Sequence, residues 1–193
     1  MDQLPEPARQ RRIVQQALRR SVLAEYAGVE VNELQLAFEP GEPISSPVEG
    51  LLVSASHFDD MTALAIVDKG LGLGVDLEPC FEEDWREALE MVLTNGELRE
   101  MDALDARLQP RRYFELWTIK ESVMKALGAA LGDRDPRSIE IKMEGRSPKI
   151  ASIDGLSPSA PWGLWCGSVN GFVCSAAVLG VRRVRAVLHE WRT

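Results

Sequence analysis

The sequence predicts an α+β fold, with antiparallel strands segregated from helices. The first observation is a set of short apolar or alternating runs bounded by Gly, Pro, Asn and Asp, typical of hairpin strands. The second is Asn170-Gly171, which separates two such runs and is the strongest short-range turn signal in the chain. The third is a loose echo of 52–67 in 166–179, which an internal duplication would produce.

The first third of the chain is expected to form one helix followed by strands. Pro7 opens a helical pattern of apolar residues, and Gly28 closes it. Turn-forming residues predict a loop over 39–47, and a polar connection that contains His57 joins the last two strands. The strands expected here are 34–38, 51–56 and 62–67.

The rest of the chain is expected to contain three helices and two hairpins. Thr94 and Glu97 have the spacing of a capping box, which opens a short helix through Leu104. In the longest helix, Pro110 can occupy the first turn, and Gly128 stands just past the last. The helices expected are 82–93, 94–104 and 113–127. The strands expected are 73–78, 138–143, 149–153, 163–168 and 172–179, with a loop over 128–136.

Length and composition exclude several classes of protein. A chain of 193 residues is long enough for one core, or for two small subdomains that share an interface. No apolar run approaches the length of a membrane-spanning helix, so no membrane partner is expected. The N-terminus is polar and unlike a secretory signal, which predicts a cytoplasmic protein.

The balance of charge points away from nucleic acid. The formal net charge of −8 is opposite to the basic faces that nucleic-acid-binding proteins present. Cys80, Cys166 and Cys174 are unevenly spaced in a chain with two histidines, so we expect reduced, buried cysteines rather than a zinc cluster. The basic residues form local clusters that either bind anions or are solvated helix faces. These clusters are Arg9, Arg11, Arg12, Arg19 and Arg20; Arg111 and Arg112; and Arg182, Arg183 and Arg185.

Two carboxylates are expected on one face of the strand 73–78. Side chains alternate along a strand, so Asp76 and Glu78 point the same way. Close like charges are relieved by protonation, by solvent or by a cation. Carboxylate oxygens suit a hard ion such as Mg²⁺ or Mn²⁺, and Glu121 is the candidate for a third ligand.

The helix 113–127 has an apolar arc that contains one lysine. Lys120 falls inside the arc, whereas Glu121 and Lys125 lie just beyond its edge. One interpretation is a snorkelling Lys120 and a surface ion pair between Glu121 and Lys125 at i,i+4. The other is that the buried face borders a functional carboxylate and amine.

Two stretches together resemble a known family. Residues 74–78 (GVDLE) and 117–125 (WTIKESVMK) resemble the paired signature of the 4′-phosphopantetheinyl transferases, G-[IV]-D and [FW]-x-x-K-E-[SA]-x-x-K. The length resembles the surfactin-synthetase-activating type. This resemblance implies two pseudo-symmetric halves, each a helix plus a small antiparallel sheet, in a monomer. We place the cofactor nucleotide side in 1–72, and the metal site with the signature helix in 73–193.

The resemblance also implies a reaction. The family transfers the 4′-phosphopantetheine arm of coenzyme A to a serine of an acyl or peptidyl carrier protein, with Mg²⁺, and releases 3′,5′-ADP. Asp76, Glu78 and Glu121 match the metal-binding carboxylates. Lys125 matches a lysine that pairs with a phosphate oxygen. Lys120 matches a second signature lysine, with a role in catalysis and, from its place in the apolar arc, as much in the position of the helix. Either Glu121 or a metal-bound water takes the serine proton.

The first half resembles the family less closely. Ser56 and His57 match an S-H element whose histidine contacts the cofactor's 3′-phosphate; the alternative is a strand-end histidine bonded to backbone. Glu42 stands where relatives commonly have a lysine near the nucleotide. The nucleotide contacts are then expected from Arg9, Arg11, Arg12 or Arg19, and carrier contacts from Arg111 and Arg112. The alternative function is a diverged, weakly active or inactive module that binds a carrier protein or synthase.

Overall fold

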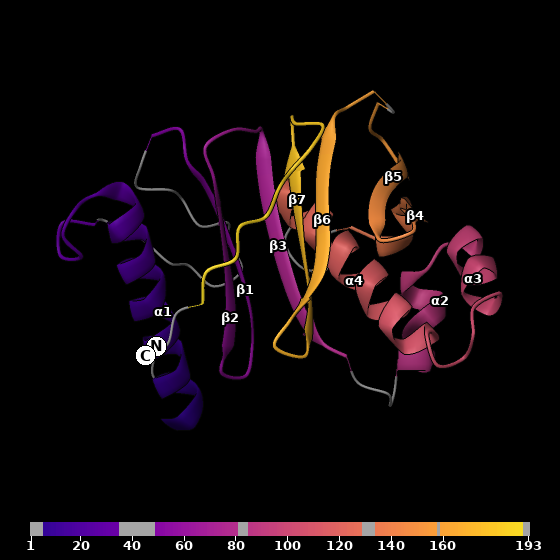
Figure 1. Ribbon diagram of the computed structural model, residues 1–193, viewed down its shortest axis with the longest axis horizontal. Helices are drawn as coiled ribbons and strands as arrows, with labels where there is room; N and C mark the ends of the chain where they lie inside the picture. The colour runs from indigo at the N-terminus through magenta and orange to yellow at the C-terminus, as the bar shows by residue number, and fades with distance from the viewer. Residues whose placement is uncertain (1–5, 35–48, 81–84, 129–133, 158, 191–193) are drawn as a thin grey trace.

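The computed structural model describes residues 6–34, 49–80, 85–128, 134–157 and 159–190 (Figure 1). It confirms the predicted α+β class, because helices pack against three separate antiparallel sheets. The helices are α1 (Glu6–Ala27), η1 (Trp85–Ala88), α2 (Leu89–Val92), α3 (Asn95–Asp102), α4 (Gln109–Ala126) and η2 (Pro136–Ser138). The strands are β1 (Leu52–Phe58), β2 (Met61–Val67), β3 (Gly72–Pro79), β4 (Ile139–Glu144), β5 (Ser147–Ile153), β6 (Trp162–Val169) and β7 (Phe172–Leu179).

The first part of the chain contains α1 and the hairpin β1-β2. Leu23 on α1 packs with Leu34 and Val53 in a small core of its own. The strand expected over 34–38 and the loop over 39–47 lie outside the described residues, except for Leu34, which is not in a strand. The connection between β1 and β2 is shorter than predicted, because Phe58 pairs directly with Met61. His57 therefore lies within β1 rather than in the connection.

The central sheet has the order β3-β7-β6, and β1 lies beside β3 (Figure 1). The β6-β7 turn forms at Asn170 and Gly171 as predicted, and both have a positive φ, which suits a tight hairpin. The structure also confirms the strands expected at 73–78, 138–143 and 149–153 within a few residues.

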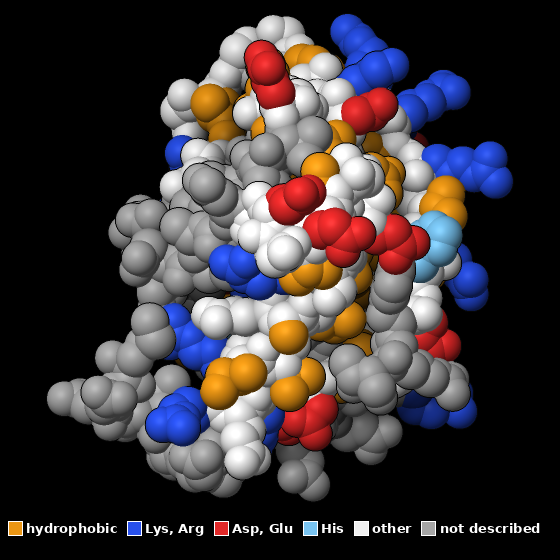
Figure 2. Space-filling view, turned by 90° about the vertical axis from the view of Figure 1, so that its left-hand side faces the viewer, with side chains coloured by type: hydrophobic (Ala, Val, Ile, Leu, Met, Phe, Trp, Pro, Cys, Tyr) orange, Lys and Arg blue, Asp and Glu red, His pale blue; other side chains and the backbone are white. Residues whose placement is uncertain are grey.

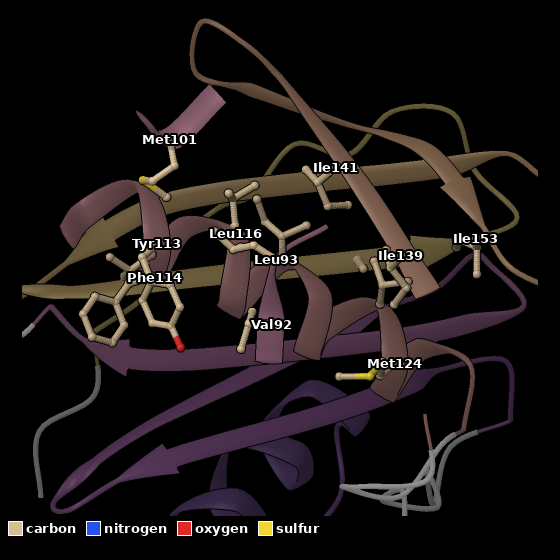
Figure 3. Close-up of a cluster of buried hydrophobic side chains, with 14 of the residues drawn as sticks. Val92, Leu93, Met101, Tyr113, Phe114, Leu116, Met124, Ile139, Ile141 and Ile153 are labelled. Carbon is tan, nitrogen blue, oxygen red and sulfur yellow. The ribbon is translucent and has the colours of Figure 1, made fainter. Parts of the chain in front are cut away.

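Helix α4 packs so closely on β3 that backbone meets backbone. A Cβ atom at Gly74 would overlap the carbonyl oxygen of Ser122, and one at Gly72 would overlap that of Ala126. Glycine is thus required at both strand positions for this approach. Opposite the sheet, α4 contributes to the main core with α2, α3 and β4 (Figure 3). The helix is consequently buried on nearly all sides rather than along one arc.

The segment before α4 differs in part from the prediction. Thr94 and Glu97 form the predicted capping box at the start of α3. In the segment 82–93, the described part forms the 3₁₀ turn η1 followed by the short α2 rather than one continuous helix. Within the described residues, no helix is both long and apolar enough to cross a membrane.

Candidate active site

Strand β3 and helix α4 bring Asp76 and Lys125 into direct contact. Asp76 is 3% exposed, and its Oδ1 accepts hydrogen bonds from Lys125 Nζ at 2.7 Å and from Ser56 Oγ at 2.9 Å. Three elements meet here, because Ser56 comes from β1. The close approach at Gly74 places the last turns of α4 over this part of β3.

Lys125 is an internal part of this cluster. Its ammonium also donates to the Val75 carbonyl at 3.2 Å and to Ser56 Oγ at 3.3 Å. Its side chain is 21% exposed, so Lys125 lies at the edge of the buried region. The interpretation as a surface pair with Glu121 is therefore wrong: Lys125 binds Asp76, and Glu121 is buried.

Glu121 and Glu78 complete an acidic neighbourhood around Asp76. Burial raises the pKa of Glu121 to about 7; the charges of Asp76 and Glu78 raise it too, and Lys125 opposes them. The pKa of Glu78 is also raised, first by burial and then by Asp76, while a hydrogen bond with Trp117 and the charge of Lys125 lower it. The three predicted carboxylates therefore interact with one another electrostatically.

These carboxylates fit a hard divalent cation in chemistry. Oδ2 of Asp76 is buried and accepts no hydrogen bond from any described residue, which leaves one oxygen available to a cation. The donor set is all oxygen, as Mg²⁺ or Mn²⁺ prefers. However, in the described ranges no three His, Cys, Asp or Glu side chains lie close enough together to hold a metal ion without rearrangement.

A histidine and an arginine lie on the β1 side of the site. His57 is exposed, and its pKa is lowered by partial burial and then by the positive charges of Arg19 and Lys125. Arg19 and His57 therefore lie in the same electrostatic neighbourhood as Lys125. Arg11 instead forms an ion pair with Asp59 at 2.8 Å, in the β1-β2 turn.

The other predicted arginines lie outside this neighbourhood or have local partners. Arg9 is exposed and Arg12 partly buried on α1, and neither is among the charges that act on His57. Figure 2 shows the face on the α1 side, where basic side chains are interspersed with acidic ones rather than gathered in one field. Glu42 lies outside the described residues. Arg111 and Arg112 both form ion pairs with Glu115.

Lys120 is not brought together with the other signature residues. Its side chain is fully buried, with Nζ 2.7 Å from Glu97 Oε2, so it does not snorkel to solvent. Sequence reasoning treated Glu97 only as the N3 residue of a capping box. The available signal was that one lysine fell inside an apolar arc and therefore required a buried acidic partner.

Two further features lie apart from the predicted site. A hollow of about 740 Å³ is lined by none of the predicted site residues. Its walls include Glu90, Leu93, Thr94, Asp135, Arg137 and Asp154.

Among the cysteines, Cys174 is buried as expected but Cys80 is exposed, and Cys166 is intermediate. Burial raises the pKa of Cys174 to about 12 and that of Cys166 to about 11, which keeps both thiols protonated and unreactive.

Several known proteins are similar to this chain in sequence. The 4′-phosphopantetheinyl transferase AcpT of Salmonella typhi is 31% identical over 123 residues, which are 63% of this chain and 55% of that protein. The 4′-phosphopantetheinyl transferase HetI of Nostoc sp. (strain PCC 7120) is 29% identical over 134 residues, 67% of this chain and 55% of that protein. The matched region thus spans about half the length of these curated relatives.

Among solved structures, the holo-(acyl-carrier-protein) synthase from Bacillus anthracis in complex with CoA (3′,5′-ADP) is similar. It has a TM-score of 0.49 and 21% identity, over 57% of this chain and 96% of that one. The holo-[acyl-carrier-protein] synthase of Thermotoga maritima has a TM-score of 0.48 and 22% identity, over 59% and 66% of the two chains. The model of the 4′-phosphopantetheinyl transferase superfamily matches residues 72–177, more than half of the chain and the part that contains both motifs. The protein therefore belongs to the 4′-phosphopantetheinyl transferase superfamily.

Proposed function

We propose that this protein transfers the 4′-phosphopantetheine arm of coenzyme A to a serine of an acyl or peptidyl carrier protein and releases 3′,5′-ADP. The serine oxygen forms a bond to the β-phosphorus, the phosphoanhydride bond breaks, and 3′,5′-ADP leaves with that electron pair. The observation that carries this proposal is the buried carboxylate of Asp76, which has one oxygen without a partner in the described structure and lies against Lys125 and near Glu121.

Asp76, Glu78 and Glu121 would hold Mg²⁺, or Mn²⁺ in its place, and the bound ion would supply positive charge to the diphosphate. Ser56 supports this role of Asp76, because its hydroxyl fixes Oδ1 and leaves Oδ2 for a ligand. Trp117 similarly orients Glu78 through a hydrogen bond. Neighbours that orient a ligand side chain in this way are typical of metal sites.

Lys125 is the amine best placed to meet the diphosphate. Its ammonium is held by Asp76, Ser56 and the Val75 carbonyl, and its side chain is partly exposed. An ammonium at this position places a positive charge where negative charge develops in phosphoryl transfer. We assign Lys125 to that role.

Glu121 is the described residue best matched to accept the serine proton. Burial and the neighbouring carboxylates raise its pKa to about 7 in the metal-free protein, which makes it a stronger base than an ordinary glutamate; a bound cation would lower this pKa. The charge of Asp76 acts on Glu121, so the two carboxylates are near each other, and the proton acceptor would be close to the diphosphate.

We infer that 1–72 supplies the nucleotide side of the site and 73–193 the reacting side. His57 and Arg19 support this division, since the charges of Arg19 and Lys125 both lower the pKa of His57 where β1 lies beside β3. Arg111 and Arg112 are our candidates for contact with the carrier protein. We expect the protein to act as a monomer in the cytoplasm.

The test is a transfer assay on the full chain. It is incubated with coenzyme A, Mg²⁺ and a panel of apo carrier proteins, and intact mass spectrometry detects the gain of one phosphopantetheine arm. We expect a gain on at least one carrier, and its loss with chelator or with Asp76→Asn. If no carrier gains mass, the proposed function is wrong.

A second candidate is a docking module of the same fold that binds a carrier protein or synthase without transfer. It is favoured by the Lys125 ammonium, which already neutralises Asp76, and by the lack of a complete metal-ligand group among the described residues. Calorimetry separates the two candidates. A transferase should bind coenzyme A more tightly when Mg²⁺ is present, whereas a docking module should bind it equally with and without the ion.

A further inference from the structure

We infer that Glu97 is a positioning residue: through Lys120 it fixes the rotation of α4 and so holds Glu121 toward Asp76. This inference rests on the proposed function, because it assigns Glu97 a role in building the same site. Glu97 itself lies outside the site, on α3, and contacts none of the three site carboxylates in the described structure.

Glu97 is buried and accepts three hydrogen bonds from its surroundings. It is 2% exposed, and its Oε2 accepts from Lys120 Nζ at 2.7 Å and from the Thr94 backbone N–H at 2.8 Å. Its Oε1 accepts from the Ile141 backbone N–H at 2.9 Å. A carboxylate needed only to cap α3 would require the bond to Thr94 alone. The bonds to Lys120 and Ile141 extend its function to α4 and β4.

The ammonium of Lys120 has a hydrogen-bond acceptor for each of its protons. Besides Glu97, its ammonium donates to the Val92 carbonyl at 2.8 Å and to the Pro136 carbonyl at 3.2 Å. All three of its protons therefore have acceptors, and these acceptors come from α2, α3 and η2. A single side chain of α4 is thus tied to three other elements.

The bonds of Lys120 determine where the next residue points. Consecutive side chains on a helix diverge by about 100°, so Lys120 and Glu121 leave α4 in different directions. Lys120 points toward α2, α3 and η2, whereas the carbonyl of Ser122, the residue after Glu121, lies against Gly74 of β3. Glu121 is buried in this turn of the helix, close enough to Asp76 and Glu78 for their charges to act on it. Any rotation of α4 that moved Glu121 away from Asp76 would break the bonds of Lys120.

The chemistry of the pair suits positioning better than stability alone. A buried ion pair contributes little net stability compared with apolar residues of the same size, but it requires specific geometry. Ile119 and Val123 are fully buried beside it, but their apolar contacts have no preferred direction. The three hydrogen bonds of the Lys120 ammonium each require a particular direction.

The experiment is a double-mutant cycle on Mn²⁺ affinity, measured by calorimetry without coenzyme A or carrier protein. The four proteins are the wild type, Glu97→Gln, Glu121→Gln and the double variant. Glu97→Gln should weaken Mn²⁺ binding by about tenfold in the wild-type background, as loss of an orienting residue usually does. In the Glu121→Gln background it should change affinity less than twofold, because the residue it positions is already gone.

Equal losses in both backgrounds would overturn the inference, since a general structural defect weakens binding regardless of Glu121. Glu100→Gln is the matched control, an exposed glutamate on the same helix, and should leave affinity unchanged. If Glu97→Gln does not fold, the cycle is repeated with Glu97→Gln/Lys120→Met in place of Glu97→Gln, which leaves neither charge buried. A loss of Mn²⁺ affinity that depends on Glu121 then supports the inference, and equal losses in both backgrounds overturn it. A wild type that neither binds Mn²⁺ nor transfers the arm overturns the proposed function as well, whereas binding with equal losses overturns the positioning role alone.

Discussion

The ammonium of Lys125 lies 2.7 Å from Oδ1 of Asp76, so the central carboxylate of the site already has a cation in contact with it. The other oxygen of Asp76 is buried and has no partner among the described residues. The two oxygens therefore have different environments: one is neutralised by the protein, and one is available. Lys125 thus competes with any second cation for the charge of Asp76.

Lys125→Met should separate these effects. Without the ammonium, Asp76 is a buried carboxylate with less compensation, so the free energy of unfolding in chelator should fall by roughly 2 kcal/mol. Mn²⁺ affinity should rise by about tenfold because a repelling charge is removed, while affinity for coenzyme A should fall. Denaturant titration and calorimetry measure these changes. Lys69→Met, at an exposed lysine, is the control, and weaker Mn²⁺ binding in Lys125→Met would contradict the competition.

The pH dependence of stability should report Glu121. Its pKa rises from 4.5 to about 7 on folding, so the folded state binds this proton more tightly than the unfolded state. The resulting stabilisation is complete below pH 4.5 and is lost as the pH rises to about 7. Relative to Glu121→Gln, the wild type in chelator should lose up to about 3 kcal/mol across this window. Urea titrations at several pH values test this, and a constant difference between the two proteins would refute it.

Gly74→Ala should disturb the contact between β3 and α4. The added methyl group would overlap the carbonyl oxygen of Ser122, which cannot turn aside because it belongs to the helix backbone. We expect a loss of about 2 to 3 kcal/mol in the free energy of unfolding, with loss of transfer activity. Gly96→Ala is the matched control: its methyl group would overlap only the flexible end of the Glu140 side chain, with Thr94 Oγ1 at ordinary contact distance, and alanine favours the α3 helix. Similar stability in the two variants would rule out the proposed steric role of Gly74.

Reversing the charge of Arg111 and Arg112 should impair carrier recognition. Both guanidinium groups pair with Glu115 but remain partly exposed, at 52% and 25%. Arg111→Glu/Arg112→Glu should raise the KM for an acidic carrier protein by about tenfold, since it replaces attraction by repulsion, and leave the KM for coenzyme A unchanged. Steady-state kinetics measure both constants, with Arg146→Glu in the β4-β5 turn as the control. An unchanged carrier KM would remove these arginines from the docking surface.

The sequence was most informative where the signal is local. The Thr94-Glu97 capping box, the Asn170-Gly171 turn and the strand β3 depend on neighbouring residues. The structure confirms the box, the turn and the strand, which extends one residue beyond the predicted 73–78 at each end. Alternation along β3 also placed Asp76 and Glu78 on one face, and the structure shows that their charges interact. Local rules therefore specified the strand that contributes most to the site.

Long-range partners were not predictable in the same way. Sequence spacing offered Glu121 as the partner of Lys125, but the fold brings Asp76 from a separate strand. Lys120 was expected to act in the chemistry or in the position of the helix, but its partner was not predicted: Glu97 comes from the preceding helix. For Lys125, the nearby sequence contained a residue of opposite charge at i,i+4, which is not its partner in the fold. For Lys120, the nearby sequence indicated no partner. The true acceptor was set by packing between elements.

The contact between α4 and β3 is made of main-chain atoms on both sides, at Gly72 and Gly74. Side chains can swing aside to admit a ligand, but a peptide carbonyl cannot, so this boundary is a fixed wall. On the opposite side, β1 belongs to a separate sheet and meets β3 through the hydroxyl groups of Ser54 and Ser56. The two boundaries of β3 therefore differ in kind: main-chain atoms form the one with α4, and side-chain hydroxyl groups bridge the one with β1.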